Sequence, residues 1–142
     1  MRLFVALPEP AQLLFAISYF DNDCSNGGIS QALMNRTGDF LPLARKGYEA
    51  IGSTYSLQWL DFMCKPFGPQ GPAPTQRERN RQMEAMTPDY WAQEDALREA
   101  WSKQAVPPPS SFNDWLSALY AVKHAAVLKP LVEQERKRAE ER

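Results

Sequence analysis

The chain is poor in the side chains that most often carry chemistry. Its 142 residues include one histidine and two cysteines, and the cysteines stand far apart with no CxxC or Cys/His spacing. This scarcity argues against a zinc site, and we expect neither a metal nor another cofactor. Cys24 and Cys64 fit a reducing compartment, where a free cysteine behaves as a small apolar residue.

Long apolar runs and an excess of charge are also missing. No stretch approaches the roughly 18–20 apolar residues that a membrane span needs, and prolines interrupt the apolar start of the chain. With 16 basic and 17 acidic residues the net charge is −1, so no overall field draws the chain to nucleic acid or to an anionic membrane. We expect a cytoplasmic protein that binds neither directly.

Helical periodicity is the strongest signal in the first half of the chain. Apolar residues recur at i, i+4, i+7 and i+11 from Leu13, which predicts a buried stripe on a helix that begins near Pro10. A helix over residues 29–36 is expected next, with Gly38 after it. Two more follow, one opened by Pro42 and ended by Gly52 and one capped by Ser53.

The second half contains two proline-rich connections and further helices. Residues 66–74, PFGPQGPAP, read as a non-helical linker, and Thr75-x-x-Glu78 is a capping box for a helix that ends near Met86. The chain restarts at Thr87-Pro88, and after a second proline run Ser111-x-x-Asp114 resembles another cap. The last helix carries an apolar band and a charged tail. Its members are Phe112, Trp115, Leu116, Leu119 and Val122.

These features predict one all-α domain over residues 1–142, because no segment shows the alternation of a strand. We expect a compact multi-helix domain with short glycine-containing corners between helices and a long C-terminal helix. Residues 11–64 form its core, residues 66–74 the linker, and residues 75–142 the helices that dock back onto the core.

The stretch NGGISQALMNRTG over residues 26–38 is the most unusual in the chain. A phosphate-binding loop would follow a buried strand and carry a lysine or a longer glycine pattern, and neither is present. A tight corner between helices explains the residues better. Gly27 and Gly28 permit the reversal, and Asn26, Gln31 and Asn35 are expected to satisfy backbone groups at the two helix ends.

The order of three motifs resembles a known family. Asn26-Gly27-Gly28-Ile29-Ser30-Gln31, then Asn35-x-x-Gly38-Asp39, then Ala50-Ile51-Gly52 is similar to the signature of a bacterial all-helical domain typified by a DNA-mimic protein. The similarity covers residues 11–64 and continues weakly to about residue 104. It implies a non-enzymatic protein that occupies another protein's surface, with acidic side chains in place of DNA phosphates.

A protein-binding function follows as the leading hypothesis. The chain would block a basic DNA-binding regulator, or a toxin for which it is the immunity protein, through an acidic rim around an aromatic centre. The candidate partner-binding residues are Asp21, Asp23, Asp39, Glu49, Asp61 and Trp91. Arg36, Arg45 and Lys46 dilute this acidic set, which makes full mimicry of a duplex less credible than a modest acidic face.

Two other classes of function stay open at this point. A hydrolase or transferase would use Cys24 or Cys64 with His124, although no local catalytic motif accompanies them. A structural homodimer would bury the apolar band of the last helix against a second copy. Other polar groups read as solvated, including the pair Glu94-Asp95 and the arginines at positions 77, 79 and 81. Most of the tryptophans read as core.

Overall fold

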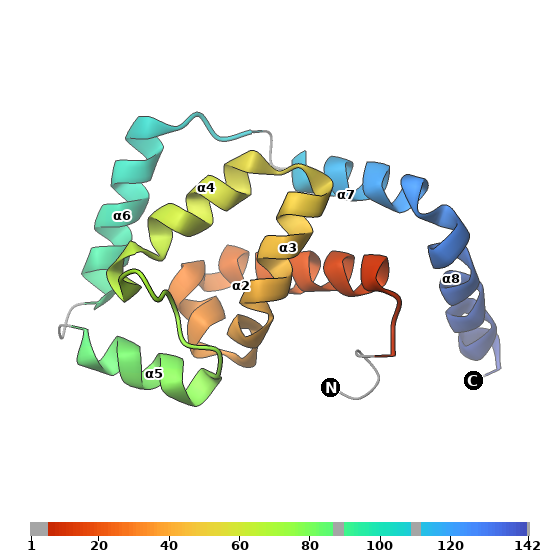
Figure 1. The fold of residues 1–142 in the computed structure, drawn as a ribbon, viewed down its shortest axis with the longest axis horizontal. Coiled ribbons are helices and arrows are strands. Elements are labelled where there is room, and N and C mark those ends of the chain that lie inside the picture. The colour runs from red at the N-terminus through yellow and green to blue at the C-terminus, as the bar shows by residue number, and fades with distance from the viewer. Residues whose placement is uncertain (1–5, 87–89, 109–111, 142) are drawn as a thin grey trace.

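The computed structural model describes residues 6–86, 90–108 and 112–141, and every regular element in these ranges is a helix (Figure 1). The all-α prediction is therefore confirmed. In chain order the elements are α2 (Glu9–Met34), the 3₁₀ turn η1 (Arg36–Phe40), α3 (Leu41–Ile51), α4 (Thr54–Met63), the 3₁₀ turn η2 (Lys65–Phe67), α5 (Gln76–Ala85), α6 (Tyr90–Gln104), α7 (Phe112–Lys123) and α8 (Ala125–Glu140).

Helix α2 runs through the middle of the molecule and contacts η1, α3, α5, α6 and α8 (Figure 1). Helices α4 and α7 pack mainly against other helices, and both contact α3. Its predicted stripe is confirmed, because Leu13, Ile17 and Phe20 are buried and Cys24 packs at the edge of the core. Helix α3 supplies Tyr48 to the same core. The core therefore sits where α2 meets the helices that follow it.

The corner after the first stripe lies inside α2, where Gly27 and Gly28 leave helical geometry. Gly28 has φ 77° and ψ −176°, a conformation that only glycine adopts readily. The N–H of Ile29 begins the second helical segment and donates 2.9 Å to Glu94 Oε1 of α6. A β-carbon at Gly28 would lie 2.1 Å from that oxygen. The corner is thus a rigid joint, as expected, but a distant carboxylate caps it.

The polar residues around the corner have other partners than those expected. Gln31 and Asn35 do not cap the backbone; their amides donate to the carboxylate of Asp23, over 3.5 Å and 3.1 Å. These bonds, with one from Thr37 as the largest influence, hold the pKa of Asp23 below its usual range. The side chain of Asn26 is exposed. Asp23 therefore ties the two helical segments together.

Arg79 corrects the prediction of a solvated arginine face on α5. Its side chain is fully buried, whereas residues 77 and 81 are exposed. The guanidinium donates five hydrogen bonds that join α5 to the end of α2 and to η1. Its acceptors are the carbonyls of Leu33, Asn35, Ala73 and Pro74 and the carboxylate of Asp39. A β-carbon at Gly38 would lie 2.6 Å from Arg79 Nε, so the glycine makes room for this group.

The remaining boundaries follow the sequence closely. Gly52 ends α3 with φ 77°, and Thr75 Oγ1 accepts the N–H of Glu78 at the start of α5. Ser53 precedes α4 as predicted, but its hydroxyl is turned to other side chains and caps no backbone N–H. Part of the linker also forms the turn η2, although it was expected to be non-helical. The predicted starts at residues 87–88 and 111 lie outside the described residues.

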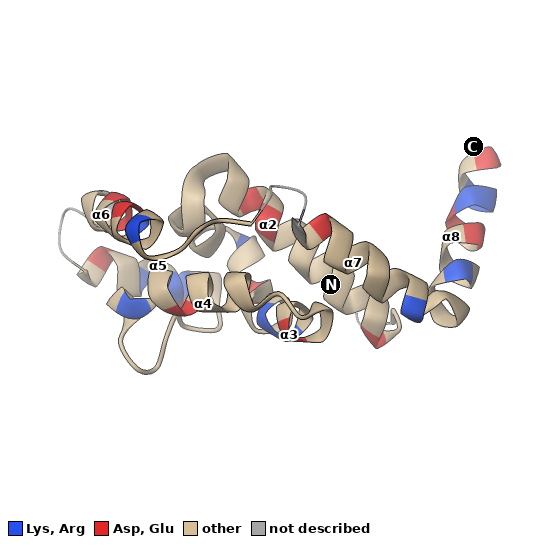
Figure 2. Cartoon of the chain, turned by 90° about the horizontal axis from the view of Figure 1, so that it is seen from above, with Lys and Arg blue, Asp and Glu red and all other residues tan. Residues whose placement is uncertain are grey.

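The long helical C-terminus is confirmed, with an interruption at His124 that divides it into α7 and α8. Helix α7 packs against α3, and α8 extends to one end of the molecule (Figures 1 and 2). The apolar band is only partly buried. Leu116 packs against the core, but Trp115, Leu119 and Val122 are 57%, 49% and 74% exposed, which corrects the expectation of a buried tryptophan at position 115.

Candidate functional site

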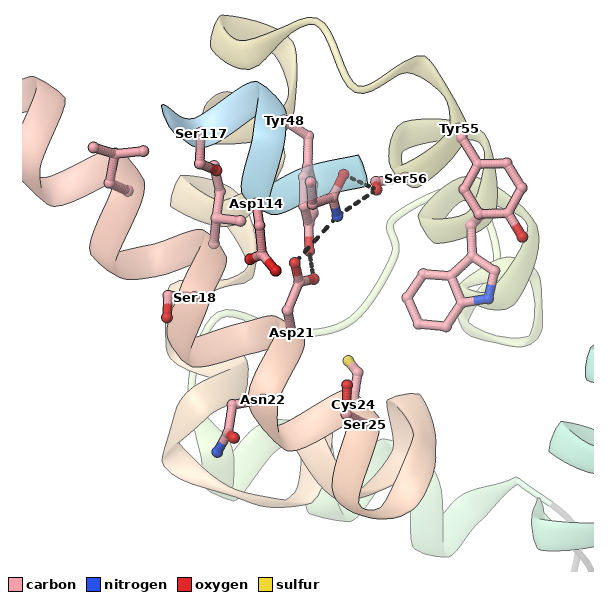
Figure 3. Close-up of a pocket in the computed structure, with 14 residues that line it drawn as sticks. Ser18, Asp21, Asn22, Cys24, Ser25, Tyr48, Tyr55, Ser56, Asp114 and Ser117 are labelled. Carbon is pink, nitrogen blue, oxygen red and sulfur yellow. Dashed lines mark hydrogen bonds between the residues drawn. The ribbon is translucent and has the colours of Figure 1, made fainter. Parts of the chain in front are cut away.

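A cavity of about 730 Å³ opens between the middle of α2 and helices α3, α4 and α7 (Figure 3). Helix α2 supplies its floor, and α4 supplies the aromatic residues Tyr55 and Trp59. Helix α7 closes the opposite side with Asn113, Asp114 and Ser117. The lining therefore comes from segments that lie up to about a hundred positions apart in the sequence.

Asp21 is the centre of a hydrogen-bond network in this cavity. Its Oδ1 accepts the hydroxyl of Tyr48, and its Oδ2 accepts Asn113 Nδ2 over 3.1 Å. The amide oxygen of Asn113 accepts the hydroxyl of Ser53 over 2.7 Å and that of Ser56 over 3.3 Å. The network joins α2, α3, α4 and α7, so it fixes the shape of the cavity (Figure 3).

The electrostatics of the cavity are set by carboxylates. Burial raises the pKa of Asp21, the hydrogen bonds from Tyr48 and Asn113 partly offset that rise, and the charge of Asp114 adds to it. Burial and the nearby Asp21 likewise raise the pKa of Tyr48, so the phenol stays a donor. No residue in the described lining is basic. The described lining thus contains two carboxyl groups and no basic side chain to neutralise them.

Only one of the five predicted acidic residues lines this cavity. Asp21 does, whereas Asp39 bonds to the buried Arg79 and Asp61 bonds to Arg45. Asp23 holds the corner, and Glu49 is exposed on α3. The predicted aromatic contact, Trp91, lies in α6, and its side chain is outside the described part of the structure. Lys and Arg positions alternate with Asp and Glu positions along the ribbon (Figure 2).

The thiols are poor nucleophiles. Burial raises the pKa of Cys24 far above that of a free thiol, and the neighbouring Asp21 raises it further. Burial raises the pKa of Cys64 to about 12. A catalytic cysteine needs the opposite shift. His124 lies between α7 and α8 with its ring 4.3 Å from that of Tyr120, and it lines neither the cavity of Cys24 nor the smaller one of Cys64.

The described residues contain no group of three or more His, Cys, Asp or Glu side chains placed to hold a metal ion. Among the described helices, none has the length and apolar character needed to cross a membrane.

Sequence reasoning missed three residues that build the core and the cavity, namely Glu94, Asn113 and Tyr48. Glu94 was expected in solvent and is 3% exposed. The sequence does not distinguish Asn113 from other residues, because asparagine is common in the first turn of a helix. Tyr48 falls within the helix expected between Pro42 and Gly52, where its ring alone predicts a core residue. Its hydroxyl carried no signal in the sequence, since its partner is 27 positions away.

The fold and the cavity define an all-helical protein with an acidic pocket. A family model described as DMP19-like protein matches residues 5–118, and the chain belongs to this family, which is one of DNA mimic proteins and generally non-enzymatic. The match is longer than the similarity over residues 11–64 indicated, and it reaches into α7. No curated protein and no solved structure matches the chain.

Proposed function

We propose that the chain is a non-enzymatic protein-binding module that inhibits a basic DNA-binding protein by occluding its surface. The observation that carries this proposal is the pair of carboxylates, Asp21 and Asp114, that faces one cavity with no basic residue in its described lining. Family membership supports it, because DNA mimics offer acidic side chains in place of phosphates. Such a chain would inhibit its partner by binding to it, without catalysing a reaction.

The distribution of charge limits how much of a duplex the chain imitates. A duplex presents one negative charge about every 1.7 Å along its axis, whereas the net charge here is −1. Asp39 and Asp61 are each bonded to an arginine, so they contribute little field. The proposed contact therefore covers a few phosphate positions around the cavity, and the surrounding surface contributes shape complementarity.

The test is a capture experiment with the tagged full chain in a lysate of its native host. Captured proteins are identified by mass spectrometry, and a captured DNA-binding protein is then assayed for DNA binding with increasing amounts of the chain. We expect loss of DNA binding, weaker capture at high salt, and little capture by the double variant Asp21→Asn/Asp114→Asn. Glu84→Gln removes an exposed charge on α5, outside the cavity and outside the predicted partner-binding residues, and serves as the control.

Two results would contradict the proposal. One is a captured regulator that binds DNA equally well with and without the chain. The other is capture that the double variant leaves unchanged. Capture of a toxin whose activity the chain blocks would replace the DNA-binding partner with the immunity function, and a toxin gene beside the gene of this chain would point the same way.

A second candidate is self-association through α7, because Trp115, Leu119 and Val122 are exposed there. Light scattering of the full chain and of Leu119→Glu/Val122→Glu tests it. A dimer that the double variant converts to a monomer supports this function, and Val106→Glu is the matched control on an exposed residue outside α7. A monomer for the unaltered chain, or a dimer that persists in the double variant, excludes it.

A further inference from the structure

The cavity between α2, α4 and α7 has the features of a site for one planar organic cation, beyond a general acidic surface. Asp21 lies on the floor of the cavity and Asp114 on its rim. The charge of Asp114 contributes to the raised pKa of Asp21. Asp114 has no hydrogen bond or ion pair with any described residue, and it is exposed. Figure 3 shows both carboxylates directed toward the same space.

The charge of Asp21 is not needed for the network it centres. An asparagine at position 21 can also accept the hydroxyl of Tyr48, in a hydrogen bond without the assistance of a charge. If the amide of Asn113 then turns over, its oxygen accepts from position 21 and its nitrogen donates to the hydroxyls of Ser53 and Ser56. A half-buried carboxylate beside a second carboxylate is unfavourable where a neutral amide would serve. The negative charge therefore indicates an occupant of opposite charge.

Some acidic residues elsewhere in the chain have a cation of the chain as a partner. Lys46 pairs with Glu9, and Arg45 pairs with Asp61. In the cavity, Asp21 and Asp114 have no lysine or arginine beside them in the described lining. Its remaining lining includes two aromatic side chains of α4, Trp59 and Tyr55, of which Figure 3 labels Tyr55.

Those aromatic residues favour one kind of cation. A guanidinium is planar, donates to two carboxylates at once, and stacks on aromatic faces, whereas an ammonium is a compact and strongly hydrated charge. The volume of about 730 Å³ holds a guanidinium with several carbons of its chain. We propose that this cavity binds a single alkylguanidinium group between Asp21, Asp114 and the aromatic residues of α4.

Two sources share this chemistry, namely a small guanidinium compound and an arginine side chain of a protein partner. The second source rests on the proposed function, but the site itself does not. A titration of the purified chain therefore tests the site, and the capture experiment tests the function.

The experiment is a calorimetric titration of the full chain with N-butylguanidinium, with N-butylurea as the neutral probe of the same shape. We expect one saturable site for the guanidinium, in about the millimolar range that suits so small a ligand, and no saturation with the urea. Asp114→Asn and Asp21→Asn should each weaken binding about tenfold or more, because each removes a charged partner. Glu84→Gln, which removes an exposed charge outside the cavity, should leave it unchanged. Circular dichroism confirms that each variant is folded.

Several outcomes would overturn the site. These are equal binding of urea and guanidinium, unchanged binding in folded Asp21→Asn/Asp114→Asn, and no saturation up to about 20 mM, well above the expected range. If the site holds, adding N-butylguanidinium to the captured complex separates the two sources. Release of the partner assigns the site to a partner's arginine, and retention of the partner assigns it to a small molecule.

Discussion

Arg79→Lys is the most direct test of how the chain is held together. The unaltered guanidinium lies fully buried and donates to four carbonyls and one carboxylate, at 2.7–3.1 Å. Lysine preserves the charge and much of the length, so the substitution removes mainly the fork of donors. The acceptors come from α2, η1 and the segment before α5. Their loss should loosen the joint between the two halves of the chain.

The size of the effect follows from the number of acceptors. An ammonium has three donors, so at least two of the five bonds to Arg79 are lost. Only the bond to the carbonyl of Leu33 is buried, and the other four are partly buried. A buried acceptor left without a donor costs about 1–3 kcal/mol and a partly buried one costs less, which places the loss at about 3 kcal/mol. Because a domain of this size unfolds with about 5–15 kcal/mol, the variant should stay folded but be markedly weaker. Its Tm should fall by about 10 °C.

Urea unfolding followed by circular dichroism measures this loss. Arg81→Lys lies on the same helix in an exposed position and should change the free energy of unfolding by less than about 0.5 kcal/mol. If both variants lose the same small amount, the five hydrogen bonds around Arg79 do not stabilise the fold as argued.

Three further results are expected. Gly28→Ala should lower the free energy of unfolding by about 3 kcal/mol, and Gly52→Ala should lower it by only about 1 kcal/mol. The difference arises because a β-carbon meets a buried carboxylate at Gly28 and open space at Gly52. Equal losses in urea unfolding would contradict this. Because the pKa of Asp21 is raised, the folded chain gains stability as the pH falls through that pKa. Asp21→Asn should therefore be at least as stable as the unaltered chain near pH 7 and should lose this advantage in acid. Lower stability of the variant at pH 7 would refute this. In the native chain Cys24 and Cys64 should react slowly with iodoacetamide near neutral pH, and after unfolding they should react quickly, as measured by mass spectrometry. A fast reaction in the native state would support the alternative of a thiol-dependent enzyme.

The sequence predicted those features that depend on neighbouring residues. Proline at the start of α3, Gly52 at its end and Thr75 before α5 act within one helical turn. Their effects therefore appear in any short window of the chain. The same is true of the Gly27-Gly28 corner, whose backbone conformation is a property of glycine itself. Local chemistry was enough for the fold class and most helix ends.

Partners of buried polar groups were not predictable in this way. Glu94 caps an N–H that lies 65 positions earlier, Arg79 binds a carbonyl 46 positions earlier, and Asn113 binds a carboxylate 92 positions earlier. In sequence each resembles an ordinary solvent-facing residue of a helix. Only the packing of helices decides which of them becomes buried. The candidate site consists of such contacts, so the sequence indicated one of its carboxylates, Asp21, without its surroundings.

The boundary of the family match falls inside α7, between the cavity residues of this helix and most of its exposed apolar face. The match ends at residue 118, within α7. The cavity residues of this helix, from Asn113 to Ser117, lie inside the match, whereas the exposed Leu119 and Val122 and the whole of α8 lie beyond it. The start of α7 closes the cavity and its end does not line it. Changes beyond residue 118 should therefore leave the cavity complete, so the proposed cation binding and the proposed self-association can be tested separately.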